Sequence, residues 1–211
     1  SYTDPEVLTV YKTWSAMITN GFFNDDANDK DWAEATEMVC RGDAAATLMG
    51  TWAIQLLTGD SCSMKAGEDF DYFAFPAITP DIPHVSVGPV DGIVMTRGSG
   101  HGAVSSKVMA YASEEDPQKL MSTGSGALAP STKVSLQFYT PFKQRLLKEI
   151  QATDYWAFNY DLATPSEVAE KGMDSFNELL AFPGEYQEIL KHLQEASAEL
   201  FQQMQRTESS N

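Results

Sequence analysis

The sequence is short of basic residues and has no long apolar run. Its 211 residues include 14 lysines and arginines against 30 aspartates and glutamates, which gives a net charge of -16. Binding to nucleic acid or to anionic lipid depends on lysine and arginine, so this composition argues against both partners. No apolar run approaches the roughly 20 residues that a membrane-spanning helix needs. No signal peptide opens the chain, which leaves a mature, a cytosolic or a fragmentary protein as alternatives.

Motifs for metals and nucleotides are also missing. The loop of small residues at 124–130 lacks the Lys-Ser/Thr pair of a phosphate loop and the spacing of a dinucleotide fingerprint. The histidines are scattered, and no Cys-x-x-Cys pair occurs, so we expect no metal site and no cofactor. The histidines are His84, His101 and His192.

The two cysteines, Cys40 and Cys62, leave two interpretations open. In an exported protein they could form a disulfide, whereas in a cytosolic protein they would be reduced core residues.

Helical periodicity covers much of the chain. Pro5 suits the first position of a helix, and Gly21 suits its end. Apolar residues repeat at helical spacing in several further segments. The sequence predicts helices from about residue 4 to 20, over 31–41, over 102–112, from about 115, over 138–150, over 164–182 and over 186–204.

The stretch 42–57 is the most informative of the sequence. Gly42 fits the left-handed residue that ends a helix, and Ala45–Leu48 are small and apolar enough for a buried strand. Gly50 allows a sharp turn and Thr51 is a suitable N-cap, which puts Trp52 in the first turn of a new helix. Open α/β sheets bind ligands at the carboxyl ends of strands. Trp52 is therefore either a stacking platform or a core residue, and the pattern alone favours the core.

Two further segments are predicted to be extended. Residues 71–78 are expected to form a strand that is interrupted near Pro76. Residues 85–95 contain a second extended run, in which Gly88 and Gly92 allow close backbone approach. Asp91 lies between two apolar runs, so it is either a turn residue or a hydrogen-bond acceptor for a ligand.

Five segments in order resemble one known family. They are GFFNDDANDKDWAEATEMVCRGDAAATLMGTWAI, FDYFAFPAITP, VGPVDGIVMTRGSGHGAVSSKVMAYAS, STGSGALAPST and YDLATPSEVAEKGMDSFNELL. Together they resemble the second half of the extracellular solute-binding proteins of sugar ABC importers, the maltose-binding-protein-like family. The resemblance runs from about Asp4 to Gln203. It implies an α/β, periplasmic-binding-protein-like fold of type II, with two lobes, crossing strands between them and a sugar in the cleft.

The resemblance also implies a domain organisation. Residues 1–84 match the α/β part of the C-terminal lobe, 85–129 a crossover segment normally in the N-terminal lobe, and 130–211 a helical return to the C-terminal lobe. Family members have a whole first lobe before the helix that begins here near Asp4, so we expect a truncated chain with the N-terminal lobe largely absent. The segment 85–123 is then expected either to expose apolar surface or to pack differently.

The resemblance assigns the site residues and reverses the interpretation of Trp52. The apolar C–H face of a sugar suits an aromatic platform, while carboxylates and amides bond its hydroxyls. Trp52 then becomes the stacking ring, and Gly126 and Ala127 match a loop at the edge of the cleft. The ligand-binding residues that the resemblance implies are Trp52, Asp91, Gly92, Trp156, Tyr160 and Asp161.

The function implied is that of a non-enzymatic receptor. It would bind a sugar or oligosaccharide, close its lobes by a hinge and deliver the ligand to the permease subunits of an ABC transporter. The resemblance implies a monomer in the periplasm or outside the cell, with lipid anchoring through a missing N-terminus as one option. Two alternatives remain open at this point. One is a glycoside-active enzyme using paired carboxylates, and the other is a binding protein for a cationic solute such as a polyamine, with Asp91, Asp154 and Asp161 as candidate acids.

Overall fold

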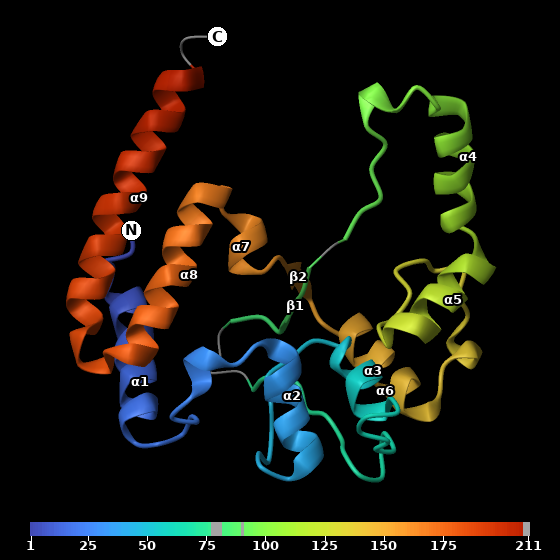
Figure 1. Ribbon diagram of the computed structural model, residues 1–211, viewed down its shortest axis with the longest axis horizontal. Coiled ribbons are helices and arrows are strands. Elements are labelled where there is room, and N and C mark those ends of the chain that lie inside the picture. Colours follow the sequence, from blue (N-terminus) through green and yellow to red (C-terminus); the bar gives the residue numbers. More distant parts are fainter. Residues whose placement is uncertain (77–81, 90, 209–211) are drawn as a thin grey trace. The chain divides into compact units, whose positions relative to one another are not determined.

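The computed structural model describes residues 1–76, 82–89 and 91–208 (Figure 1). The chain divides into two compact units, one made of Ser1–Lys30 with Phe158–Asn211 and the other of Asp31–Ala157. The first is called unit 1 below and the second unit 2. The described residues are mostly helical and include a small parallel sheet.

All the described secondary-structure elements of unit 1 are helices or 3-10 turns. Helix α8 packs along α9, and α1 packs against both of them. The elements of unit 1 are α1 (Pro5–Thr19), a 3-10 turn at Ala27–Asp29, α7 (Tyr160–Ala163), α8 (Ser166–Ala181), a 3-10 turn at Pro183–Glu185 and α9 (Tyr186–Glu208).

The core of unit 1 lies where these three long helices meet. Leu179 and Leu190 are fully buried, and Tyr11 packs beside them. The Tyr11 hydroxyl, which would be unsatisfied in an apolar core, lies 2.7 Å from the Ser175 hydroxyl. Apolar burial therefore connects the beginning of the chain to its last two helices.

Unit 2 contains shorter elements and the described sheet. Strands β1 and β2 pair in parallel, with Val85 opposite Tyr155 and Val87 opposite Ala157. The elements of unit 2 are α2 (Trp32–Arg41), α3 (Ala53–Thr58), β1 (Val85–Val87), a 3-10 turn at Arg97–Ser99, α4 (Gly102–Ala112), α5 (Glu115–Ser125), a 3-10 turn at Leu136–Phe138, α6 (Pro141–Gln151) and β2 (Tyr155–Ala157).

The predicted helices are confirmed, and their ends follow local signals. The Asp31 side chain accepts hydrogen bonds from the first turn of α2, and the Asp31 amide donates to the Glu34 carboxylate, which completes a capping box. Gly42 ends α2 with a φ of 79°, the left-handed value expected there. Pro5 occupies the first turn of α1.

The two predicted strands near Trp52 and after residue 70 are wrong. Ala45–Leu48 form no strand, and the Leu48 side chain is 78% exposed instead of buried. Residues 71–76 form no strand either, while 77 and 78 lie outside the described residues. A strand needs a neighbour for its backbone groups, and apolar composition alone does not supply one.

The segment around residue 71 is held by side-chain contacts instead of the backbone hydrogen bonds of a β-sheet. The rings of Phe70 and Tyr72 meet Phe142 of α6 edge-on, with centroids 5.5 and 5.4 Å apart. The Arg145 guanidinium lies 5.1 Å from the centre of the Tyr72 ring and pairs with the Asp71 carboxylate. These contacts anchor the segment to α6.

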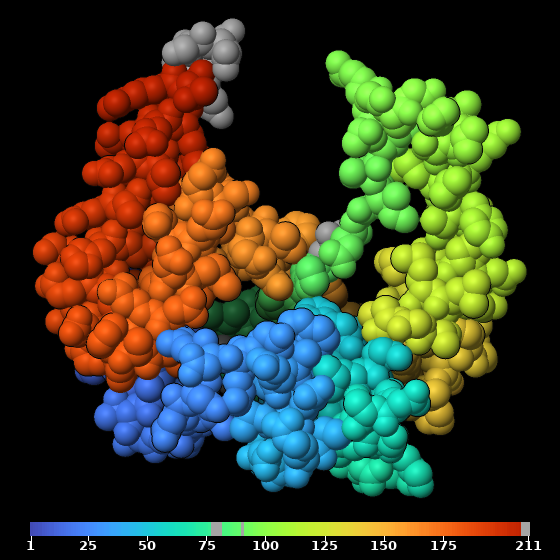
Figure 2. All heavy atoms as spheres, in the orientation of Figure 1, coloured from blue at the N-terminus to red at the C-terminus, as the bar shows by residue number. Residues whose placement is uncertain are grey.

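Many apolar side chains among the described residues between 82 and 121 are exposed, which is the first of the two outcomes expected for this segment. Val104, Val108 and Tyr111 follow one another at helical spacing on α4 (light green in Figure 2) and are 62%, 59% and 63% exposed. Val94, just before this helix, is 82% exposed. A contiguous apolar stripe of this kind is a candidate contact surface.

Candidate ligand-binding site

Trp52 is placed by the turn that precedes α3. The helix begins at Ala53, so Trp52 is its N-cap residue, and the predicted cap at Thr51 is wrong. Trp52 has helical backbone angles (φ -63°, ψ -24°), and its carbonyl accepts from the Gln55 amide at 3.2 Å. Trp52 is partly exposed, so the structure gives it neither the full burial of a central core residue nor a fully open ring.

The Trp52 indole lies directly over Gly50. A Cβ atom at position 50 would lie 2.2 Å from Cζ3 and 2.4 Å from Cη2 of the indole, distances that no side chain tolerates. A side chain at position 50 would therefore displace the indole from its place over the backbone.

Trp156 is supported in the same way. This residue lies in β2 with half of its surface exposed, and a Cβ atom at Gly88 would lie 2.9 Å from Cζ2 of its ring. The Gly88 amide donates to the Ala157 carbonyl at 3.1 Å and continues the pairing of β1 with β2. Two partly exposed tryptophans of unit 2 therefore each rest on a glycine.

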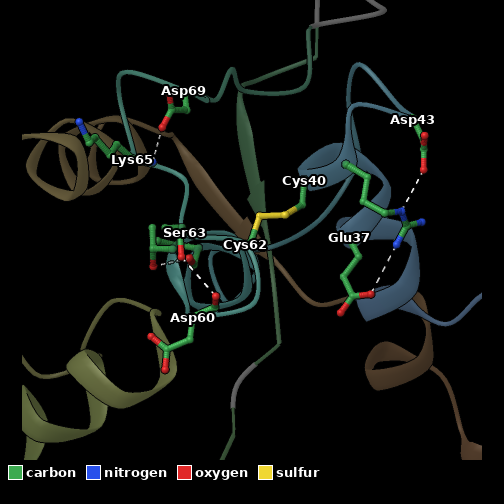
Figure 3. Close-up of a disulfide and its surroundings, with 11 residues drawn as sticks. Glu37, Cys40, Asp43, Asp60, Cys62, Ser63, Lys65 and Asp69 are labelled. Carbon is green, nitrogen blue, oxygen red and sulfur yellow. Dashed lines mark hydrogen bonds and ion pairs between the residues drawn. A yellow bond between two sulfur atoms is a disulfide. The ribbon is translucent and has the colours of Figure 1, made fainter.

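A disulfide closes the chain around Trp52. Cys40, near the end of α2, is joined to Cys62, just after α3, with their Cα atoms 5.7 Å apart (Figure 3). The closed loop contains α3 and the whole turn that carries Trp52, and α3 packs against α2. Of the two interpretations open for the cysteines, the structure supports the disulfide, which belongs to oxidising compartments.

Asp91 and Gly92 lie in an exposed, irregular segment of unit 2. Nothing lies within 4 Å of the position of a Gly92 Cβ, so the close backbone approach expected of this glycine is absent among the described residues. Gly88, by contrast, has that close approach, from the Trp156 ring. Asp91 is exposed.

Tyr160 and Asp161 belong to unit 1. The Tyr160 hydroxyl lies 2.7 Å from the Tyr2 hydroxyl, and its ring meets Phe176 edge-on with centroids 5.8 Å apart. Burial, followed by the hydrogen bond to Tyr2, raises the pKa of Tyr160. Within unit 1 this ring is thus a packing residue whose hydroxyl is already bonded, whereas Asp161 is exposed.

The predicted site residues are thus divided between the units. Unit 2 contains Trp52, Asp91, Gly92 and Trp156, and unit 1 contains Tyr160 and Asp161. In the described part of the chain, no group of three or more histidine, cysteine or acidic side chains is arranged to hold a metal ion. No helix among the described residues combines the length and apolar character needed to cross a membrane.

The sequence reasoning missed the role of the two supporting glycines. Gly50 stands two residues before its tryptophan, so the Gly-x-Trp spacing was an available signal. Gly88 and Trp156 are far apart in the sequence, and only the pairing of β1 with β2 brings them together.

The comparisons with known proteins define the class. The profile of the bacterial extracellular solute-binding protein family matches residues 1–157, which is more than half of the chain, so the chain belongs to this family. Membership in an extracellular family implies a periplasmic or extracellular location. One relative is an uncharacterized ABC transporter extracellular-binding protein of Pyrococcus horikoshii, which is 23% identical over 181 residues. The match covers 86% of this chain but 38% of the relative, so the chain spans well under half the relative's length.

Proposed function

We propose that this chain belongs to the carbohydrate-binding receptor of an ABC importer, which binds a sugar or oligosaccharide and delivers it to the permease subunits. Membership in the solute-binding family and the name of the Pyrococcus relative support a transport role. The observation that carries the carbohydrate assignment is the partly exposed Trp52 indole, supported by Gly50 and enclosed by a disulfide loop.

The chemistry of the proposed site follows from its side chains. A pyranose presents C–H groups on one face, and an indole ring offers a flat apolar surface of similar size. Trp52 and Trp156 are the stacking rings in this proposal. In unit 2, the exposed Asp91 carboxylate accepts hydrogen bonds from sugar hydroxyls, and the Gly92 backbone is a further ligand contact. In unit 1, the proposed ligand contacts are the exposed Asp161 carboxylate and Tyr160.

The proposal includes the two-lobed fold of type II. Residues 85–129 are the crossover segment that packs on an N-terminal lobe, while 1–84 and 130–211 belong to the C-terminal lobe. The exposed stripe of Val104, Val108 and Tyr111 on α4 supports this assignment, because burying it would remove apolar surface from water. Anchoring by a lipid on a segment before Ser1 belongs to the same proposal.

The test is a calorimetric titration of the complete coding product, including whatever precedes Ser1, with di- and oligosaccharides. Trp52→Ala is expected to weaken binding of the best sugar by about tenfold, the loss of a stacking contact of roughly 1.4 kcal/mol. Trp32→Ala is the matched control, because Trp32 is also in unit 2, is 48% exposed and lies outside the proposed site.

Equal affinity of the Trp52→Ala and unaltered proteins for every sugar would show that the stacking assignment is wrong. Spermidine in the same panel tests the cationic-solute alternative, since an amine that binds more tightly than all sugars would support it. Analysis of the titrated sugars for hydrolysis products tests the enzyme alternative.

A further inference from the structure

The turn that follows α5 lies against the first turn of α3. Gly126 is buried there with a φ of 74°, and a Cβ atom on it would lie 2.6 Å from the Gln55 amide nitrogen. The same atom would lie 2.8 Å from the Gln55 Cβ. Position 126 therefore excludes a side chain twice, by its backbone angle and by its contact with α3.

The Gln55 amide is the group that bonds the Trp52 carbonyl, at 3.2 Å. The backbone of Gly126 thus lies beside the Gln55 amide, the group that donates a hydrogen bond to the Trp52 carbonyl. The Gln55 peptide unit therefore connects the Gly126 turn to the backbone of Trp52.

The turn at Gly126 is itself firmly held. The Ser122 hydroxyl donates to the Ala127 carbonyl at 2.6 Å, and the Lys143 ammonium, from α6, donates to the Ser122 carbonyl at 3.3 Å. The Ala129 amide donates to the Tyr139 hydroxyl at 3.1 Å. Because the last carbonyls of a helix lack partners inside it, the Lys143 contact also stabilises the end of α5.

The other end of α3 is held by the disulfide. Cys62 follows this helix closely and is bonded to Cys40 of α2. Helix α3 is therefore supported at its beginning by the Gly126 turn and at its end by the Cys40–Cys62 bond.

From this geometry we infer that Gly126 is a positioning residue for Trp52: its turn sets the first turn of α3 and, through it, the orientation of the indole over Gly50. The consequence for ligand affinity rests on the proposed function, but the positioning itself does not. Gly126 acts through Gln55, with no contact to the ligand required.

The experiment uses a protein in which Trp52 is the single tryptophan, made by replacing Trp14, Trp32 and Trp156 with phenylalanine. Gly126→Ala is expected to change the acrylamide quenching constant of Trp52 about twofold and to shift its emission maximum. Gly124→Ala is the matched control, because a Cβ at this α5 position meets nothing within 4 Å. A second protein with Trp156 alone reports on general loosening of unit 2, and Gly126→Ala is expected to leave its quenching unchanged.

The inference would be overturned if Gly126→Ala left the quenching and emission of Trp52 the same as in the single-tryptophan protein without this change. Equal changes at Trp52 and Trp156 would also overturn it. If Gly126→Ala does not fold, Lys143→Met replaces it, since this change removes the hydrogen bond to the Ser122 carbonyl and keeps an unbranched side chain. Its Trp52 quenching is expected to shift in the same direction, and an unchanged value would overturn the inference.

Sugar titration of the complete, unaltered coding product and of its Gly126→Ala variant separates this inference from the proposed function. A Trp52 shift in the variant, with no sugar bound by the unaltered protein, would uphold the positioning role and refute the carbohydrate assignment. Tight sugar binding by both proteins, with no Trp52 shift, would refute the positioning role and leave the carbohydrate assignment standing.

Discussion

The two units of this chain are stabilised in different ways. Unit 1 has side chains that are almost entirely excluded from water, with Leu179, Ile189 and Leu190 no more than 1% exposed. In unit 2, the buried large side chains Phe142 and Leu57 keep 7% and 6% exposure, and Phe73 is 80% exposed. Apolar burial is thus deepest in unit 1, whereas unit 2 combines its buried side chains with local connections: the disulfide, the α2 capping box and the aromatic contacts on α6. The two tryptophans proposed to bind ligand belong to the less buried unit.

The largest expected effect is on the core of unit 1. Leu179→Ala is expected to lower its free energy of unfolding by about 4 kcal/mol, because the cavity cannot collapse among three packed helices. Urea unfolding followed by hydrogen exchange in α8 and α9 measures this loss. Leu162→Ala, at a 50% exposed leucine of α7, is the matched control and is expected to cost well under half as much. Equal losses in the two variants would contradict the claim that burial stabilises unit 1.

The next largest effect is expected from the disulfide of unit 2. Replacing Cys40 and Cys62 together by serine removes a constraint on a loop with a sequence separation of 22. The expected loss is about 3 kcal/mol, through the greater entropy of the unfolded chain. Amide exchange should accelerate in α2 and α3 and stay unchanged in α8 and α9. Uniform acceleration in both units would mean that the bond does not act on unit 2 alone.

A smaller effect is expected from the capping box of α2. Asp31→Ala leaves the Ala33 and Glu34 amides without their side-chain acceptor, at a cost of about 1 kcal/mol. Asp43→Ala is the control, since its carboxylate makes an exposed ion pair with Arg41 that is expected to contribute less. Helix-specific exchange rates distinguish the two variants, and a larger loss in Asp43→Ala would refute the role of the cap.

The smallest effect is expected at high pH in unit 1. Since burial raises the pKa of Tyr160, the unfolded chain releases this proton at a lower pH than the folded one. The resulting stability is fully present below about pH 10, the ordinary pKa of tyrosine, and is lost as the pH rises through the folded value. Tyr160→Phe is expected to flatten the fall in stability between about pH 9 and 11. Unfolding curves with the same pH dependence in both proteins would contradict this assignment.

Local signals in the sequence predicted the helices well. Pro5 and Gly42 act on backbone groups within a few residues, so their consequences could be inferred without knowing the fold. The parallel pairing of β1 with β2 could not be inferred from local signals, because it joins Val85 to Tyr155 across most of unit 2. The predicted strand at Ala45–Leu48 failed for the same reason, as composition does not reveal whether a pairing partner exists.

The candidate site was predictable only in part. Trp52 and Trp156 could be selected as aromatic candidates, and the structure leaves both partly exposed. The bond between Tyr160 and Tyr2 joins residues 158 positions apart, so no local pattern indicated it. The close fit of Trp52 over Gly50 depends on the indole rotamer, and the sequence contains no information on that angle beyond the glycine itself.

The most direct test of the central claim is acrylamide quenching of Trp52 as the single tryptophan in the complete coding product, with and without a saturating oligosaccharide. If Trp52 lies against a bound sugar, the sugar will shield the indole, lower its quenching constant and shift its emission. An oligosaccharide that binds by calorimetry but leaves Trp52 equally accessible would contradict the account.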